Sequence, residues 1–333
     1  MNRPNAWLLS LTIASVAFLA HPVLADPVPA PVLTWGTLGA GPNNLDHPFG
    51  IATDNLGNFF VADQHNQRVQ VFDATGDLIR SFGSEGSAPG QLEYPTGICL
   101  SPDGAYVYVV ENHNHRVSKF TRNGVFVQWI GSPTPDFAFH PGNFFYPVAA
   151  VCDASGNLLV ADSEDHVVQR FTSGGTLIDW FGGYGSGPGQ LDTPYGIDID
   201  GAGNIYVSSN GDGRVSKFSP AGYFMFSWGG YGGVPGLFYG PEGIAHDAAG
   251  NIYVCDTGNN RIQKFRSDGT FVLQFGVLGG LLGQLYTPSG IAIDPNGDIF
   301  IAEWNNARIQ RFSTTGVTAA KHASWGSVKN AYR

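Results

Sequence analysis

Apolar residues in this chain occur in short runs, and the runs come in sets of four. In one set the first run is small and apolar, Gly243–Ala245, and the second is β-branched and aromatic, Asn251–Val254. The third, Arg261–Phe265, alternates polar and apolar residues, and the fourth, Phe271–Gly276, ends in an aromatic residue followed by Gly. Runs of this length and composition are typical of β-strands.

The set of four runs repeats along the whole chain. A Pro precedes the first run at positions 48, 95, 147, 194, 241 and 288, in steps of 47, 52, 47, 47 and 47 residues. Segments such as "DNLGN" and "DAAGN" between the first and second runs have the Asp and Gly of tight hairpin turns. A period near 45 residues with four antiparallel strands per unit predicts an all-β fold, a six-bladed β-propeller.

The start of the chain predicts how the ring closes. In most units an aromatic residue ends the fourth strand thirteen residues before the next Pro, and Trp35 stands thirteen residues before Pro48. The segment Val32–Gly36 is therefore a fourth strand without a unit of its own. We expect it to pair with the third strand of the last unit and to remove two open sheet edges. The rival is "HASWG" near the C-terminus, but Trp325 follows Phe312 by thirteen residues where the other units need ten.

The units resemble a known repeat family. Segments such as "GPEGIAHDAAGNIYVCDTGNNRIQKFRSDGTFVLQFG" are similar to NHL repeats, and the resemblance covers Val32 to about Gly326. The resemblance implies the propeller fold. It does not specify a function, because propellers of this kind serve as enzymes, RNA-binding modules and protein-binding platforms.

The N-terminus predicts export. Arg3, the apolar run Trp7–Ala20 and the small residues up to Ala25 have the pattern of a signal peptide, and the apolar run is too short for a membrane-spanning helix. We divide the chain into a signal peptide (1–25), a short leader (26–31), the propeller (32–326) and a C-terminal tail (327–333). The mature protein is expected to be periplasmic or extracellular, without a membrane anchor.

Charge disfavours nucleic acid as a partner. Without Arg3 the chain has 16 Lys and Arg against 27 Asp and Glu, a net charge of −11. A surface with this average field repels a phosphate backbone.

The two tight hairpins of each unit fall on one face of the ring, and the longer loops fall on the other. We call the second face the long-loop face. Sites on propellers are expected there, because these loops vary without breaking the blades. The residue after each Pro should surround the channel mouth: Phe49, Thr96, Val148, Tyr195, Glu242 and Ser289. This set indicates either a small ligand pocket or a channel that side chains plug.

An insertion on the same face offers a second candidate contact. The link Gly131–Pro147 is longer than the others and rich in aromatic residues. It indicates either a loop that grips a partner or a local cluster packed on the blade rim. The candidate contacts are Phe137, Phe139, Phe144 and Phe145.

A carboxylate five residues before an Arg recurs after the second strand of most units. The pairs are Asp63 and Arg68, Glu111 and Arg116, Asp256 and Arg261, and Glu303 and Arg308. Unit three has Val167 at the Arg place, and unit four has Ser209 at the acid place. A catalytic acid should be special to one unit, so the recurrence favours structural ion pairs that brace each loop.

The sequence predicts no resident metal or cofactor, although calcium or zinc in the central channel stays open. His65, His113, His115 and His166 have no ligand spacing, and Cys99, Cys152 and Cys255 are interpreted as buried apolar residues. The peptidyl-hydroxyglycine amidating lyases are similar in fold, and that resemblance implies zinc-binding His directly after the Pro of three blades. None of the six positions is His here, so that activity is not carried over. NHL proteins that act in ubiquitin transfer have a separate zinc-binding RING domain. This chain has three Cys in all and no Cys/His cluster, so that role is not carried over either.

The sequence therefore favours an exported NHL propeller that binds a protein, peptide or glycan on its long-loop face, with no catalytic residue assigned. The alternatives are a channel-centred lyase or lactonase-like hydrolase, for which Glu242, Asp198 and His246 are the candidate metal ligands, and a structural component of the cell envelope.

Overall fold

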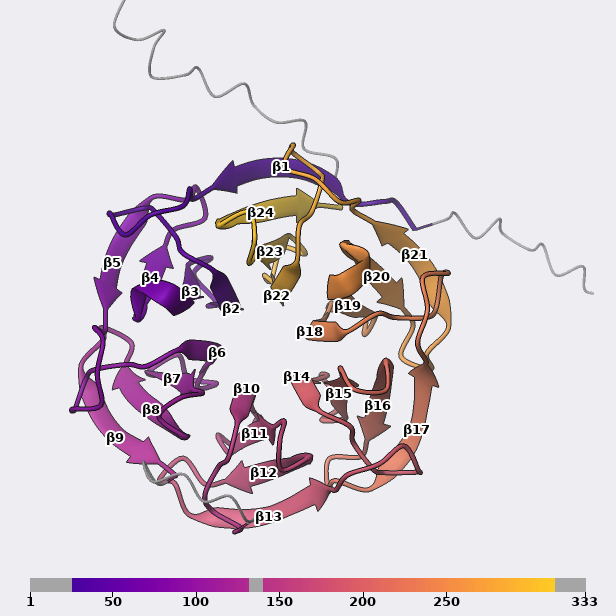
Figure 1. Ribbon diagram of the computed structural model, residues 1–333, viewed down its shortest axis with the longest axis horizontal. Helices are drawn as coiled ribbons and strands as arrows, with labels where there is room; N and C mark the ends of the chain where they lie inside the picture. Colours follow the sequence, from indigo (N-terminus) through magenta and orange to yellow (C-terminus); the bar gives the residue numbers. More distant parts are fainter. Residues whose placement is uncertain (1–25, 132–139, 315–333) are drawn as a thin grey trace, which may run out of the picture.

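Six four-stranded antiparallel sheets stand around a central axis like the blades of a propeller (Figure 1). The computed structural model describes residues 26–131 and 140–314. The predicted signal peptide, the C-terminal tail and the rival closing strand at Trp325 lie outside these residues, as do Phe137 and Phe139. Within the described residues, no helix has the length and apolar character needed to cross a membrane.

In blades one to five the chain passes from the innermost strand to the outermost one. Blade one has β2 (Pro48–Thr53), β3 (Phe59–Asp63), β4 (Arg68–Phe72) and β5 (Leu78–Phe82). Blade two has β6 (Pro95–Leu100), β7 (Tyr106–Glu111), β8 (Arg116–Thr121) and β9 (Phe126–Ile130). Blade three has β10 (Pro147–Cys152), β11 (Leu158–Asp162), β12 (Val167–Phe171) and β13 (Leu177–Gly182).

Blade four has β14 (Pro194–Ile199), β15 (Ile205–Ser209), β16 (Arg214–Phe218) and β17 (Phe224–Gly229). Blade five has β18 (Pro241–His246), β19 (Ile252–Asp256), β20 (Arg261–Phe265) and β21 (Phe271–Phe275). Blade six has β22 (Pro288–Ile293), β23 (Ile299–Glu303) and β24 (Arg308–Ser313), followed in space by β1 (Ala30–Trp35). Two short 3₁₀ turns, η1 (Gln64–Asn66) and η2 (Thr257–Asn259), follow the second strands of blades one and five.

The N-terminal strand closes the ring, as the sequence predicted. Strand β1 pairs antiparallel with β24, from Ala30 opposite Ser313 to Trp35 opposite Ile309. It begins two residues earlier than the predicted Val32–Gly36 and ends one residue earlier. In Figure 1 this first strand lies outermost on the last blade, so that both ends of the described chain are held in one sheet.

The hydrophobic core lies between neighbouring blades. Six buried clusters are formed, each from the facing sheets of two adjacent blades. Trp35 of the closing strand belongs to the cluster between blades six and one, where its ring lies 4.8 Å from Phe59 and 6.0 Å from Phe300. The stability of this ring therefore depends on every blade having two neighbours.

Glycine allows the innermost strands to approach one another around the axis. A Cβ on Gly290 would lie 2.2 Å from the carbonyl oxygen of Phe49 in the next blade, and one on Gly196 would lie 2.2 Å from that of Glu242. Both distances are far below van der Waals contact. This explains the Pro-x-Gly sequence at the start of five of the six blades, where blade three has Ala149 instead.

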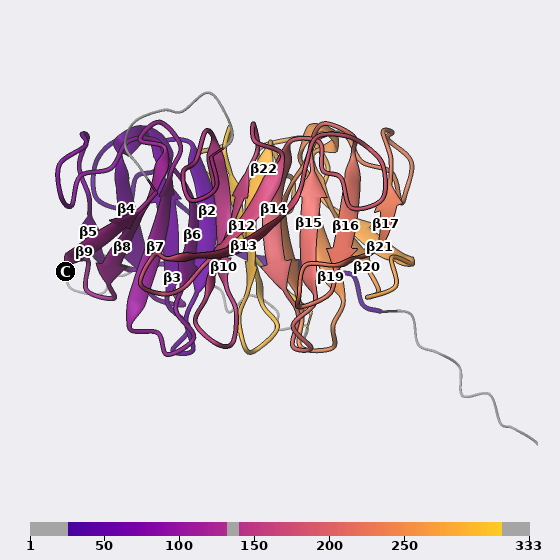
Figure 2. The same ribbon diagram turned by 90° about the horizontal axis from the view of Figure 1, so that it is seen from below.

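The connecting loops gather at the two rims of the disc (Figure 2). One rim has the tight hairpins within each blade. The other, the long-loop face, has the links between blades and the turns after each second strand.

Candidate functional site

Two aromatic side chains from opposite blades meet at the axis and divide the channel. The rings of Phe49 in blade one and Tyr195 in blade four have their centroids 6.4 Å apart. Both side chains line a cavity of about 550 Å³ on the hairpin side and one of about 340 Å³ on the long-loop side. Phe49 and Tyr195 thus form a floor shared by the two cavities. The sequence left open whether the channel forms a small pocket or is filled by side chains. In the structure Phe49 and Tyr195 fill it at one level, and a cavity lies on either side of them.

The cavity on the long-loop side, which we call the axial pocket, has mostly aromatic walls. Its lining contains five Phe, Tyr or Trp residues, two His and a single carboxylate, and it contains no Lys or Arg. The aromatic residues are Phe49, Tyr94, Tyr146, Tyr195 and Trp304. The indole Nε1–H of Trp304 donates to the side-chain oxygen of Gln64 at 3.1 Å, and Tyr94 stacks on His113 at 3.9 Å. These contacts hold the rings of the pocket wall in place.

Five of the six residues that follow the Pro line this pocket: Phe49, Thr96, Val148, Tyr195 and Glu242. Ser289 does not. Its side chain is 1% exposed, and its hydroxyl donates to the carbonyl of Pro48 at 3.0 Å. Ser289 therefore joins blade six to blade one, and it lines the cavity on the hairpin side instead of the axial pocket.

Among the described residues, Glu242 has the only carboxylate in the pocket lining. Burial raises the pKa of this carboxyl group to about 8. Among the described residues the Glu242 side chain has no hydrogen bond and no salt bridge, whereas its backbone carbonyl accepts a hydrogen bond from Ser208 at 2.5 Å. An acid without a partner in such a place favours the neutral form until a positive charge arrives.

In the described part of the inserted link, Phe144 does not lie at the surface. Phe144 is 1% exposed and packs 5.3 Å from Phe171 in the core between blades two and three, so the prediction of a ligand contact is wrong for it. It stands three residues before Pro147, and the equivalent residues of the other blades are all fully buried: Leu45, Leu92, Leu191, Phe238 and Leu285. Phe145 is partly exposed, and its backbone N–H donates to Asp162 at 2.8 Å.

The four predicted loop pairs are in contact, and each is the centre of a larger network. The Arg Nε lies 2.7 Å from Asp63, 2.8 Å from Glu111, 2.7 Å from Asp256 and 2.6 Å from Glu303 in the respective pairs. All four carboxylates are fully buried. They lie beneath the loops of the long-loop face and not in the axial pocket.

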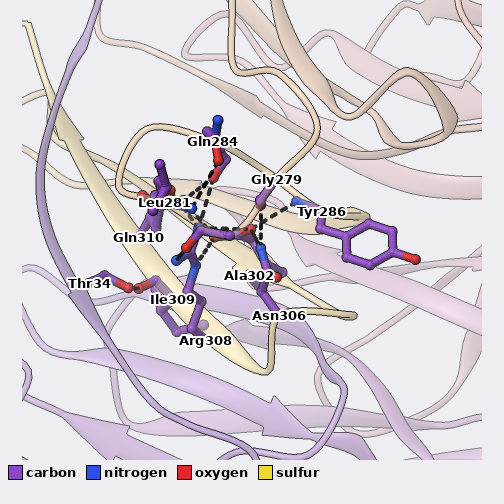
Figure 3. A network of polar contacts seen from close by, with 12 residues as sticks. Thr34, Gly279, Leu281, Gln284, Tyr286, Ala302, Asn306, Arg308, Ile309 and Gln310 are labelled. Carbon is purple, nitrogen blue, oxygen red and sulfur yellow. Dashed lines mark hydrogen bonds and ion pairs between the residues drawn. The ribbon is translucent and has the colours of Figure 1, made fainter.

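Figure 3 shows the network of blade six. The side chain of Arg308 donates to the carbonyl oxygens of Gly280, Leu281 and Gln284 in the link from blade five. The carboxylate of Glu303 accepts hydrogen bonds from Arg308, Asn306, Gln310 and the backbone N–H of Tyr286. The ion pair thus satisfies four backbone groups of the inter-blade loop, in line with the structural role that its recurrence indicated.

Blades three and four depart from the network in different ways. In blade four Arg214 pairs with Asp212 of its own turn, since the acid place is Ser209. In blade three Asp162 keeps its backbone partners but faces Asp165, at the place where blades one, two, five and six have an Asn that donates to the carboxylate. Burial, and next the charge of Asp162, raises the pKa of Asp165 to about 7.

This exception predicts a pH-dependent gain in stability for Asp165→Asn. The pKa of Asp165 is higher in the folded state than the ordinary value of 3.8, so this group's contribution is complete below that value and is lost as the pH rises through about 7. An Asn donates to Asp162 at every pH. After a discount for the partial exposure of Asp165, we expect the variant to be about 1–2 kcal/mol more stable at pH 8.5.

Urea unfolding at pH 8.5 and at pH 4 measures this effect. At pH 4 Asp165 is protonated in the folded state and partly protonated in the unfolded chain, so wild type and variant should agree within about 0.5 kcal/mol. Equal stability at pH 8.5 would mean that Asp165 is not held against a charged Asp162. Asp179→Asn on the outer strand is a matched control without pH-dependent gain.

Two of the loop histidines make contacts between blades that the sequence did not predict. Nδ1 of His166 accepts the backbone N–H of Thr193 at 3.0 Å, and Nδ1 of His115 lies 2.5 Å from the carbonyl oxygen of Phe145. In both cases the side chain joins one blade to the link of the next. His113, by contrast, is exposed at the pocket rim.

His65 belongs to a cluster that sequence reasoning missed. Nδ1 of His47 lies 2.5 Å from Oδ1 of Asp46, and Nδ1 of His65 lies 3.6 Å from the same oxygen. Burial, and next the neighbouring His47, lowers the pKa of His65. One carboxylate and two imidazoles form a donor set that zinc accepts, and in the described part of the chain this is the one such group of three. The available signal was the Asp-His pair directly before Pro48.

The candidate metal ligands of the channel do not form one set. Glu242 lies in the axial pocket, whereas Asp198 and His246 line the cavity on the hairpin side. Nδ1 of His246 lies 2.7 Å from Oδ2 of Asp198, and this hydrogen bond raises the pKa of His246. Cys99 and Cys152 line the same cavity as free thiols, with their Sγ atoms 3.7 Å apart.

Comparison with known families agrees with this geometry. The NHL repeat matches residues 45–72, 238–265 and 285–312. The SMP-30/Gluconolactonase/LRE-like region matches residues 83–181, and a β-propeller repeat matches residues 180–214. Streptogramin B lyase superposes with a TM-score of 0.58 at 15% identity, over 85% of this chain and 98% of that one. A gluconolactonase from Xanthomonas campestris gives 0.60 at 15% identity, over 87% and 98%. At these identities the structures show the fold alone, and the protein is a six-bladed β-propeller.

Curated relatives match parts of the chain. Protein brain tumor of Drosophila melanogaster is 25% identical over 44% of this chain and 14% of its own length. Peptidyl-glycine alpha-amidating monooxygenase A of Xenopus laevis is 31% identical over 33% and 13%, and human NHL repeat-containing protein 3 is 31% identical over 26% and 25%. This chain spans less than two thirds of each relative. Together with the repeat matches and the fold, these findings identify it as an NHL-repeat propeller.

Proposed function

We propose that this chain is an exported binding scaffold whose long-loop face holds a protein, peptide or glycan. One observation supports this proposal above the others. The polar residues that recur in the blades are used to brace the loops, whereas the residues around the axial pocket differ from blade to blade. A surface that differs at each blade is suited to recognising one asymmetric ligand.

Export rests on the first 25 residues, and the acidic composition supports a partner other than nucleic acid. The place of action is then the periplasm or the extracellular space. The aromatic rim supports recognition of a folded or extended partner, because Tyr and Trp contribute most to binding energy at protein interfaces.

Replacement of Tyr146 by Ala tests this proposal. Tyr146 stands at the pocket rim and is partly exposed, so its ring is available to a partner. With immobilised protein of residues 26–333 and exported proteins, peptides and cell-wall glycans from its own source, a partner should bind the variant at least tenfold more weakly, about 1.4 kcal/mol.

The matched control is Tyr223→Ala. Tyr223 is 75% exposed in a tight hairpin on the opposite face, and its replacement should leave the dissociation constant unchanged. A partner that loses affinity on replacement of Tyr223 and keeps it on replacement of Tyr146 would place the binding surface on the hairpin face, against the proposal.

A further inference from the structure

Charge is distributed unevenly around the axial pocket. Its lining has no Lys or Arg and one acid, Glu242, at the channel axis. Burial lowers the pKa of His65, which disfavours a positive charge on this imidazole. Among the described residues, the pocket lining thus has one carboxylate and no Lys or Arg to neutralise it.

Glu242 is partly exposed and differs from the fully buried acids of the fold. Asp63, Glu111, Asp256 and Glu303 each have an Arg and several further donors. Glu242 has no donor to its side chain among the described residues, and burial is the sole cause of its raised pKa. A partly buried acid without a partner carries a desolvation penalty that a bound cation would relieve.

The walls of the pocket suit the rest of such a ligand. The faces of aromatic rings attract cations, and their edges and faces accept the methylene groups next to the charge. Tyr195 forms the floor beside Glu242, and Tyr94, Tyr146 and Trp304 stand around the mouth. The volume of about 340 Å³ falls at the small end of ligand pockets, which suits one side chain and not a folded domain.

We propose that the axial pocket binds an organic monocation, the protonated lysine side chain of a partner peptide, with Glu242 as its counter-ion and the aromatic rings as its walls. This inference rests on the proposed function, since it names the group that the long-loop face recognises. It assigns Glu242 to binding and assigns it no chemical step.

Calorimetry with two small probes tests the inference on protein of residues 26–333. N-α-acetyl-lysine N-methylamide has the cation, and N-α-acetyl-norleucine N-methylamide has nearly the same shape without it. The lysine probe should bind at least tenfold more tightly than the norleucine probe at pH 7. Butylamine distinguishes the source of the cation: binding weaker than that of the lysine probe supports a peptide, and equal or tighter binding contradicts the peptide assignment.

Glu242→Gln should weaken binding of the lysine probe at least tenfold and leave that of the norleucine probe unchanged. Glu242→Asp retains the charge and should give an intermediate affinity. Glu85→Gln removes an exposed acid away from the pocket lining and should behave as wild type. Near-UV circular dichroism of each variant establishes that the aromatic packing is retained.

Proton release provides a second readout. At pH 7 the carboxyl group of Glu242 is mostly protonated, so binding of a cation should release a proton and make the enthalpy depend on the buffer. Glu242→Gln should abolish this dependence. The other titratable groups near the pocket are His65, His113, Tyr94, Tyr146, Tyr195 and Glu164.

Equal binding of both probes, or unchanged affinity in Glu242→Gln, would overturn the inference. If that happens while Tyr146→Ala still weakens a captured partner, the proposed function stands and only the cation assignment fails. If neither variant changes binding, both fail.

Discussion

A chain that begins at Leu38, and therefore lacks strand β1, is expected not to form a stable monomeric propeller. Strand β1 makes the outermost ladder of blade six, and without it β24 becomes an open edge. The deletion also removes Trp35, whose ring packs against Phe59 and Phe300 between the last blade and the first. Trp35 is partly buried, so its loss alone costs at most about 3–5 kcal/mol, against a total stability of about 5–15 kcal/mol for a typical domain.

Urea unfolding followed by circular dichroism, with light scattering to determine the mass, measures this effect. The control is a chain that begins at Pro29. It retains β1 and loses the ion pair of Asp26 with Lys264, which is 2.7 Å long and 33% exposed on the Asp side. This pair should contribute about 1 kcal/mol or less. An unchanged urea midpoint for the chain from Leu38 would indicate that the segment around Trp325 can supply the closing strand instead.

The fold was accessible to sequence reasoning because its determinants repeat. The Pro spacing and the Asp and Gly of the hairpins recur from unit to unit. The spacing of Trp35 before Pro48 matches that of the aromatic residues that end the fourth strands. The spacing of five residues from Asp or Glu to Arg recurs in the same way. Each pair satisfies carbonyls of an inter-blade link, so its structural role could be deduced from its recurrence.

The burial of Phe144 also follows from its position in the repeat. The residue three before each Pro is a core residue in every blade, and Phe144 occupies that place. The aromatic composition of the insertion suggested a surface contact, whereas the place of Phe144 three residues before Pro147 determines that it is buried.

The axial pocket was only partly accessible, because it depends on features that occur once. The periodicity predicts which residues surround the axis, but not that Phe49 and Tyr195 reach across it from opposite blades. Asp46, His47 and His65 come together in blade one through the packing of their side chains, since the left-handed backbone of His47 (φ 53°) recurs in the residue before the Pro of four other blades. Side-chain direction of this kind follows from the packing and has no repeating sequence signal.

The second large effect is expected from Glu111→Ala in the network of blade two. Arg116 is 1% exposed, and its Nε donates to Glu111 at 2.8 Å. Glu111 also accepts hydrogen bonds from Asn114 at 2.6 Å, from Ser118 and from the backbone N–H of Glu93 at 3.1 Å. Removing the carboxylate leaves these donors and a buried guanidinium without a partner, which we expect to cost about 3–5 kcal/mol.

The equilibrium urea midpoint of Glu111→Ala, with an unchanged m-value, measures this cost. Glu111→Gln keeps two polar atoms of the same shape and loses the charge, so it should lose roughly half as much. The control is Asp179→Asn, which breaks the 3.6 Å pair with Arg170 on the outer strand, where Asp179 is 45% exposed, and should cost less than about 1 kcal/mol. If Glu111→Ala costs no more than this control, the guanidinium does not depend on its acid. The carbonyls of Ser87 and Gln91 would then be sufficient to hold Arg116, and the recurring acids would need a role other than bracing the blades.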